Sequence, residues 1–419
     1  MQKMFVTLAT VALATPALAT ISLDGRYDYS SATSNTQLNS NQNGVSGFLF
    51  NRLALMGTSA LNDDTTVNAR LNLLAFSKDS GATGVAGGAY DTTNANAVSK
   101  LSGVQPPASG LVLNGLPVTG TTDLVEYAEV VQKYNSQLSF KFGKLATAGF
   151  GGFESMSYVT EMYFASQAYM ALNNFVGAAA VWKFMDTQTF EAYLLNNDNS
   201  ADATRNAYNF VYRGTFGDFG VIANYGNIPE GNQTGTSNAI TKNLMTLGVS
   251  YRLTDWSFAV DYDAYTNFGN TIAAAINNSG TTTVTGYNGL ALGTNHNTTQ
   301  NSVVATARYR MNNWTPWVKL ESTSRSGYQS TPNSTSDASD SIFNWSVAAE
   351  YKKSDKSDWR YHIAYVNAAT NYDSNSKYFL TYPGVANGTF GTTAGQQTNA
   401  TVTAQYVFVG LRYAGDFLK

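Results

Sequence analysis

The sequence predicts an all-β protein, a transmembrane antiparallel up-and-down β-barrel of about 16 strands with long outer loops and a third loop folded inward. Short segments alternate apolar and polar side chains, which is the period of a strand with two different faces. Tight turns and long polar loops alternate between these segments. Only 13% of the 419 residues are charged while 13% are aromatic, a balance that fits a sheet with one apolar face.

Residues 1–19 have the features of a secretory signal peptide, namely Lys3, an apolar stretch and the sequence Ala17-Leu18-Ala19. The barrel domain is therefore expected to cover residues 20–419. The apolar stretch is too short to cross a bilayer, and no later segment approaches the ~20 apolar residues of a transmembrane helix. The sequence thus excludes a helical membrane protein.

Composition also limits the ligands. The chain has no cysteine, so it forms neither a disulfide scaffold nor a thiolate metal site, and we expect no cofactor or metal. Its formal net charge of -3 argues against a nucleic-acid partner.

Alternation predicts 16 strands, of which 123–133 is the one whose two faces the pattern does not distinguish. The strands are expected near residues 21–29, 52–57, 67–73, 123–133, 136–142, 176–184, 189–195, 206–213, 219–225, 244–253, 256–264, 302–311, 314–321, 342–351, 359–365 and 401–413.

The connections fall into two classes. Tight turns at 254–255 and 312–313 alternate with long polar loops such as 266–301 and 367–399. Short turns at one end and long loops at the other are typical of an outer-membrane barrel. An even number of strands places both ends of the barrel domain on the short-turn side. Seven of the eight prolines are expected in the signal or in loops, and Pro316 alone in a strand, near its beginning.

Tryptophans mark the predicted membrane boundary. Trp256, Trp314 and Trp359 each begin a strand beside a short turn, and Trp182 lies near the end of another. Rings at one height form an aromatic girdle, which a soluble β-sandwich would have no reason to build. The pattern therefore favours a barrel that spans an outer membrane.

Residues 143–175 interrupt the alternation. This glycine-bearing, aromatic segment contains only two acids, Glu154 and Glu161, and it needs a surface to lie on. The flanking strands suggest the inside of the barrel, so we interpret the segment as a pore constriction loop.

Two stretches resemble a known family. The final strand, from Gln405 to Tyr413 and then Phe417, is similar to the terminal strand of Gram-negative porins, although Leu418 and Lys419 follow the aromatic residue. Phe150-Gly151-Gly152 resembles part of the Pro-Glu-Phe-Gly-Gly motif in the third loop of the general diffusion porins, with Ala148-Gly149 in place of the proline and acid. The resemblance implies a water-filled channel for passive diffusion of ions and small solutes, a third loop in the lumen, and homotrimers in a membrane of lipid and lipopolysaccharide.

Several charged residues occupy strand positions whose side chains should face the barrel interior, and these are the expected charges of the constriction. Arg26, Arg52 and Arg70 lie on consecutive strands, and Arg412 lies on the last strand, which pairs with the first if the barrel closes. These four should form one basic patch, to which inward parity adds Lys141. Glu154 and Glu161 are expected opposite, where they would complete a transverse field.

Three other functions are weighed against this one. A sugar-selective porin would use an aromatic track, with Trp317, Tyr158 and Tyr163 as the residues that stack on the solute. A structural or adhesive barrel would act through its outer loops. An enzyme is not expected, because His296 and His362 are the only histidines and neither belongs to a recognisable catalytic set.

The outward faces suggest how copies associate. All six tryptophans lie at or after Trp182, and five of them point outward by parity. The first three strands instead present aliphatic residues with Gly25 and Gly57 to the outside. Since interfacial tryptophans mark walls that meet lipid, the sector without them is expected to pack against neighbouring barrels in a trimer.

Overall fold

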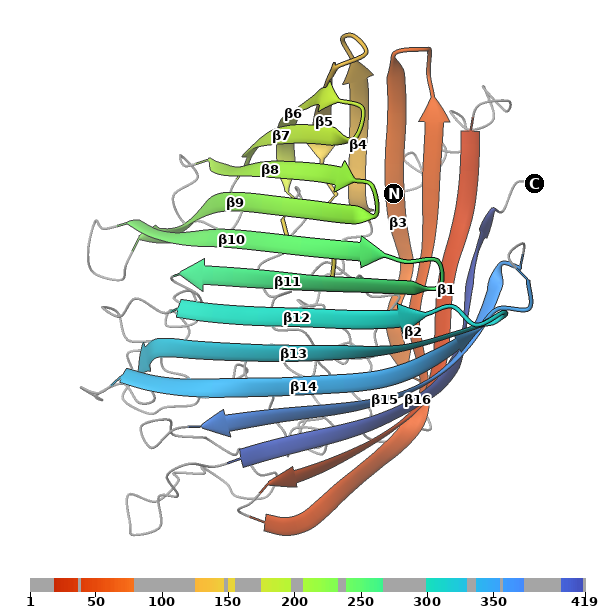
Figure 1. Cartoon of the computed structure of the whole chain (residues 1–419), viewed down its shortest axis with the longest axis vertical. Helices are drawn as coiled ribbons and strands as arrows, with labels where there is room; N and C mark the ends of the chain where they lie inside the picture. The colour runs from red at the N-terminus through yellow and green to blue at the C-terminus, as the bar shows by residue number, and fades with distance from the viewer. Residues whose placement is uncertain are drawn as a thin grey trace.

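The computed structural model describes the chain as a closed antiparallel barrel of 16 strands (Figure 1). The described residues are 19–36, 39–78, 125–146, 150–154, 175–196, 206–232, 239–266, 299–329, 337–354, 357–372 and 401–416. The strands are β1 (Ala19–Thr36), β2 (Asn39–Ala60), β3 (Thr65–Lys78), β4 (Val125–Lys133), β5 (Leu138–Lys144), β6 (Val176–Met185), β7 (Gln188–Leu195), β8 (Ala207–Phe216), β9 (Phe219–Asn232), β10 (Ala239–Arg252), β11 (Trp256–Thr266), β12 (Thr299–Tyr309), β13 (Trp314–Gln329), β14 (Asp337–Tyr351), β15 (Trp359–Tyr372) and β16 (Thr401–Asp416).

Each strand pairs with its neighbours in sequence, and β1 pairs with β16 to close the ring. The closing register runs from Ser22 opposite Asp416 to Thr36 opposite Val402. Closure leaves no strand edge unpaired, which a sheet exposed to hydrocarbon requires. The predicted strand number and the antiparallel fold class are confirmed. Residues 1–18 lie outside the described part of the chain, so the signal peptide stays a prediction.

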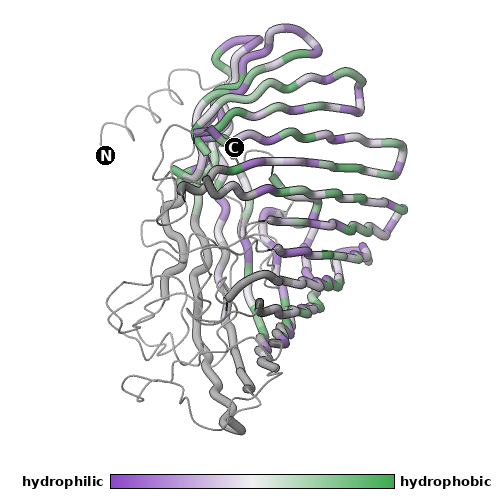
Figure 2. The backbone as a smooth tube through the Cα atoms, turned by 90° about the vertical axis from the view of Figure 1, so that its left-hand side faces the viewer, coloured by the Kyte–Doolittle hydropathy of each residue, from purple (hydrophilic) through white to green (hydrophobic). Residues whose placement is uncertain are grey.

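The two faces of the sheet differ as the alternation predicted. On β11, Trp256, Phe258, Val260 and Tyr262 are exposed on the outer face. Asp261, between Val260 and Tyr262, is completely buried on the inner face. Hydrophilic and hydrophobic residues alternate along the strands in Figure 2. An apolar outer face and a polar inner face are the reverse of the arrangement in a soluble protein and are typical of a membrane barrel.

The short turns gather at one end of the barrel, at the right of Figure 1 for the pairs β8–β9, β10–β11 and β12–β13. Two of these turns use the left-handed backbone region, with φ of 61° at Gly217 and 50° at Asn312. Glycine adopts this region without steric cost and asparagine tolerates it, so both residues suit tight hairpins. The start of β1 and the end of β16 share the short-turn end, as expected.

The aromatic girdle is confirmed beside those turns. Trp256 lies 4.7 Å from Tyr309 between ring centroids, and Trp314 and Trp359 lie 5.0 Å from Tyr351 and Tyr413. Each pair joins two adjacent strands, because the partners are directly opposite in the register. Rings at this spacing add to the burial energy and fix the strand ends at the interface.

Two details of the sequence prediction were wrong. Several strands extend further toward the long loops than alternation indicated, for example β13 to Gln329 instead of residue 321. The apolar period ends where the outer face becomes serine and threonine, whereas backbone pairing continues beyond it. Pro229, expected in a loop, lies in β9 opposite Thr241. A register shift between Ile240 and Thr241 accommodates it, since a bulge removes the need for the missing N–H.

Among the described residues, no helix is both long enough and apolar enough to cross a membrane.

The two environments along β13 predict a depth-dependent cost of charge. Leu320 is 43% exposed on the outer face, and Ser324 is exposed on the same face closer to the long loops. Leu320→Lys should lower the free energy of unfolding by ~2–4 kcal/mol, and Ser324→Lys by about 0–1 kcal/mol. Equilibrium unfolding by guanidinium in lipid vesicles measures both values. Equal costs would contradict the assignment of this face to the bilayer.

Candidate functional site

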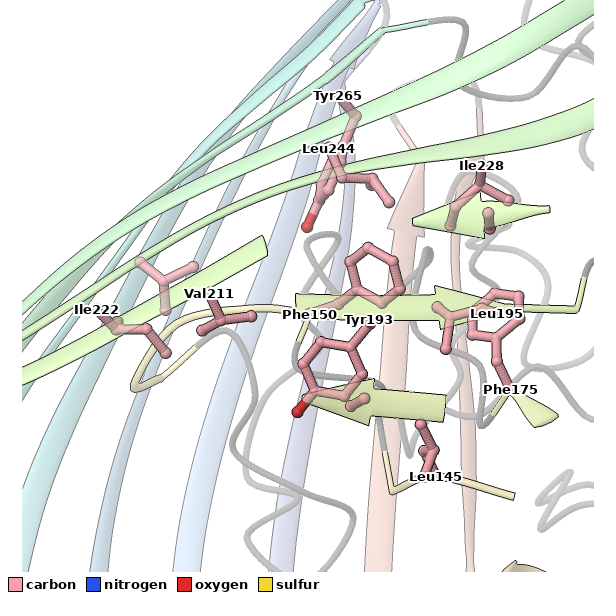
Figure 3. Close-up of a cluster of buried hydrophobic side chains, with 13 residues drawn as sticks. Leu145, Phe150, Phe175, Tyr193, Leu195, Val211, Ile222, Ile228, Leu244 and Tyr265 are labelled. Carbon is pink, nitrogen blue, oxygen red and sulfur yellow. The ribbon is translucent and has the colours of Figure 1, made fainter. Parts of the chain in front are cut away.

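An apolar cluster covers the inner face of part of the barrel, which is unusual for a wall that borders a lumen. We call it the inner apolar cluster, and Figure 3 shows Phe150 among Tyr193, Leu195 and Leu244 within it. Phe175 lies 6.0 Å from Phe150 between ring centroids. The members are Leu145, Phe150, Phe175, Ala179, Tyr193, Leu195, Ala207, Val211, Ile222, Ile228, Leu244, Tyr265 and Val304.

Glycines on the barrel wall leave space for two phenylalanines of the segment 143–175, Phe150 and Phe153. A Cβ atom at Gly226 on β9 would overlap the ring of Phe150. Cβ atoms at Gly220 and Gly248 would lie 3.1 Å from the ring of Phe153. Glycine in a strand often marks a close approach, and here both rings reach the sheet because no side chain intervenes. The two phenylalanines therefore fix residues 150–153 against β9 and β10.

Asp261 on β11 binds the backbone of the same segment. Its two carboxylate oxygens accept hydrogen bonds from the N–H groups of Phe153 at 3.0 Å and Glu154 at 2.5 Å. A Cβ atom at position 152 would collide with this carboxylate, so Gly152 is required for the contact. Gly151 has φ of 93°, and its carbonyl accepts a 2.8 Å hydrogen bond from Asn224. The Phe-Gly-Gly sequence thus fits the wall through both of its glycines.

Glu154 joins the segment to two further strands. Its carboxylate lies 3.3 Å from Arg308 on β12 and 3.2 Å from Lys319 on β13. Lys319 also donates a 3.0 Å hydrogen bond to the Glu154 carbonyl and is only 1% exposed. A buried ammonium needs such partners, because its desolvation would otherwise be prohibitive. Glu154, expected opposite the basic patch as part of a transverse field, is buried and paired with Arg308 and Lys319.

Residues 150–154 therefore lie on the inner faces of β9 to β13. These strands follow the segment in sequence by more than 60 residues. We call residues 150–154 the anchored segment. Residues 147–149 and 155–174 lie outside the described part of the chain, and with them Glu161, Tyr158 and Tyr163. Their predicted roles in the constriction stay predictions.

The basic patch occupies one line across four adjacent strands. Arg52 is opposite Arg26, Arg26 is opposite Arg412, and Arg412 is opposite Arg360 in the register of β2, β1, β16 and β15. We call this row the arginine ladder. Directly paired positions have Cα atoms ~4.5–5.5 Å apart, so four arginines share a short arc of the barrel.

Arg70 adjoins the ladder through Asp24. The Asp24 carboxylate lies 2.9 Å from Arg70 on β3 and 3.2 Å from Arg412 on β16. The sequence predicted a grouping of Arg26, Arg52, Arg70 and Arg412. Arg26, Arg52 and Arg412 share one row of the register, whereas Arg70 is opposite Met56 and shares Asp24 with Arg412. Arg360 extends the row because β15 follows β16 around the closed ring.

Lys141 belongs to a different group. It lies 3.7 Å from Glu191 on β7, which also binds Arg213 at 3.1 Å and accepts a hydrogen bond from the Tyr193 hydroxyl. Sequence reasoning named Lys141 but missed Glu191 and Arg213. Inward parity on β7 and β8 was available as a signal, but which inward acid meets which cation depends on the register between strands.

Trp317 points inward as predicted and is 7% exposed. The Arg308 guanidinium lies over one face of its indole, 5.6 Å from the centroid. His362 is buried on β15, directly opposite Glu350 on β14. The described residues contain no group of three or more His, Cys, Asp or Glu side chains placed to hold a metal ion.

Comparison with known proteins gives similarity of architecture. No family model and no curated protein matches the sequence. Its structural neighbours are porins and related outer-membrane proteins. OmpF of Salmonella typhi, solved with daunomycin, shares 12% identity over 94% of this chain and 97% of its own, with a TM-score of 0.49. The anion-selective porin of Comamonas acidovorans shares 11% identity over 95% of this chain and 100% of its own, with a TM-score of 0.49. OmpT of Vibrio cholerae, described in a trimer form, shares 13% identity over 95% of this chain and 100% of its own, with a TM-score of 0.45.

The Asp261 contacts predict how firmly the anchored segment is held. Asp261→Asn replaces a charged acceptor of two amide hydrogen bonds, and a hydrogen bond to a charged group contributes ~1.5–3 kcal/mol. Amide hydrogen exchange in residues 150–154 should accelerate by about 10- to 100-fold, measured by mass spectrometry.

Asp263→Asn is the matched control. Asp263 lies two residues further along β11 on the same inner face and accepts a 2.6 Å hydrogen bond from Thr246 on β10. Exchange in the anchored segment should stay as in the parent protein. Acceleration by both variants to the same extent would mean that general destabilisation, not the loss of this clamp, frees the segment.

Proposed function

We propose that the protein is an outer-membrane porin, a water-filled channel through which ions and small hydrophilic solutes diffuse passively. The main support for this proposal is a closed 16-strand barrel with an apolar outer face and ionised side chains on its inner face. Barrels of about this strand number leave an aqueous channel, whereas eight strands are filled by side chains. No binding of a particular solute and no chemical step is part of the proposal.

Water in the lumen is supported by the exposure of its cations. Arg213 and Arg360 lie on the inner face, and their side chains are 41% and 38% exposed. A charge facing lipid near the bilayer centre costs ~2–4 kcal/mol, while a lumen charge keeps its hydration. Ionised groups that face inward and stay partly exposed fit a channel and do not fit a dry barrel core.

We propose that residues 143–175 form the constriction. The anchored segment supports this, because its contacts with Asp261, Arg308 and Lys319 hold it on the inner wall of β11 to β13. The inner apolar cluster under it occupies the β6 to β12 side, and the arginine ladder lies on β15, β16, β1 and β2. The open path then runs beside the ladder. Trp317, with one face under Arg308, offers less for a sugar track than a free indole would.

We propose also that the protein is exported by residues 1–19 to the outer membrane of a Gram-negative bacterium, where it meets lipid and lipopolysaccharide and assembles as a homotrimer. The support for a trimer is the uneven outer wall. Trp182, Trp256, Trp314 and Trp359 are exposed on β6, β11, β13 and β15. Leu23 and Leu55 on β1 and β2 lie in direct register in the sector without tryptophan.

The channel proposal predicts stepwise conductance. Protein purified in detergent and added to a planar lipid bilayer in potassium chloride should produce discrete current steps of uniform size, and the same preparation denatured by heat should not. Liposomes containing it should admit small neutral sugars without saturation. If neither current nor solute uptake appears while the protein is folded and inserted, the barrel is structural or adhesive.

The trimer proposal predicts a variant that separates the copies. Leu55→Arg places a charge in the proposed subunit contact and should convert the trimer to a monomer, as measured by light scattering in mild detergent. Leu320→Lys, on the tryptophan-bearing side, should lower stability but leave the trimer intact. A parent protein that is monomeric in the same detergent contradicts the proposal.

A further inference from the structure

The ion pairs of the lumen are uneven in how they face water. Arg213 is 41% exposed while its partner Glu191 is 9% exposed, and Arg360 is 38% exposed against 15% for Glu350. Arg308 is 29% exposed against 9% for Glu154, and Arg412 is 17% exposed against 3% for Asp24. The pairs of Arg70 and Lys141 have the same order. Two pairs of described residues differ. Lys319, bound to Glu154, is 1% exposed, and Lys183 on β6 is 45% exposed against 101% for Asp186 in the short turn.

The numbers of acids and cations explain this order. Three inward acids each bind two cations: Asp24 binds Arg70 and Arg412, Glu191 binds Lys141 and Arg213, and Glu154 binds Arg308 and Lys319. In each of these groups the acid is less exposed than the more exposed of its two cations. This order of exposure is local and does not depend on the net charge of the chain.

Three further inner acids contribute little to the surface that water meets, whereas Glu129 on β4 is half-buried and accepts a 3.3 Å hydrogen bond from Asn68. Asp261 and Asp263 are completely buried, and Glu321 is 1% exposed. Asp261 accepts the amides of the anchored segment, and Glu321 accepts hydrogen bonds from Asn344 and Thr323.

The arginine ladder places partly exposed cations on one side of the barrel. Arg360 and Arg412 are both partly exposed, and the register continues from them to Arg26 and Arg52. Arg360 and Arg412 are like charges in directly paired positions, and such charges repel each other, which costs stability in a sheet. Such an arrangement persists when the field that it creates has a use, and clefts lined by one sign of charge raise the local concentration of the opposite ion.

We infer that the channel prefers small anions to cations, with chloride, inorganic phosphate and short carboxylates as the solute class. The inference rests on the proposed channel function and goes beyond it by naming the selectivity. The formal net charge of -3 for the chain would by itself favour cations. Because screening in salt limits an exposed charge to ~10 Å at 0.1 M, we expect the exposed lumen cations to outweigh exposed charges at more distant parts of the chain.

The reversal potential across a planar bilayer tests the inference, with a tenfold gradient of potassium chloride at low salt. We expect the sign set by chloride and a chloride-to-potassium permeability ratio on the order of 2 to 10. The double variant Arg360→Gln and Arg412→Gln should lower this ratio by at least about twofold, and Arg213→Gln should lower it by less, since that site lies off the ladder.

Lys353→Gln is the matched control. It also removes one positive charge, but Lys353 is exposed in the short turn after β14, outside the strands that line the lumen, and should leave the reversal potential unchanged. Normal current steps in each variant establish that the barrel has folded. Steps with a ratio below 1 in the parent protein, or a ratio that the ladder variants leave unchanged, overturn the inference and leave the channel function standing. Absence of steps in the parent protein overturns the channel function itself.

Discussion

The structure depends on the pairing of β1 with β16. Hydrocarbon offers no partner to a backbone N–H or C=O group, so a sheet in a bilayer is stable only when it has no edge. The 15 register pairs from Ser22–Asp416 to Thr36–Val402 remove that edge. The same closure brings residues near the two ends of the chain together, and it is the reason that Arg412 becomes a neighbour of Arg26 and Asp24.

Closure also creates an interior, part of which is filled by packed side chains and part of which is open to water. The inner apolar cluster, the glycines opposite Phe150 and Phe153, and the Asp261 carboxylate hold the anchored segment to the β9 to β13 side. Lys319 contributes through a constraint of its own, since its buried ammonium is neutralised by Glu154. Packing on one side leaves the charges of the other side to the lumen, and this division underlies both the proposed constriction and the proposed anion preference.

The outer face obeys a simpler rule. Along β11 and β13 every other side chain is apolar until the strand passes the membrane, and tryptophan or tyrosine marks the boundary at the short turns. Beyond the opposite boundary, serine and threonine replace the apolar residues while the strands continue. The lipid-facing pattern therefore measures the thickness of the bilayer and not the length of the strand, which is why strand ends near the long loops were predicted too early.

The sequence by itself determined the number of strands, their antiparallel order and the face of each tryptophan. These follow from a period of two and from turn length, which are local properties that neighbouring residues record. Only the tertiary structure decided that Glu154 binds Arg308 and Lys319, that Asp261 clamps the anchored segment, and that Lys141 pairs with Glu191. Such contacts join residues more than a hundred positions apart in the first two cases, and parity says only that a side chain faces inward. Which inward side chains meet depends on the register of every intervening strand, and on glycines such as Gly226 that matter for the space they leave.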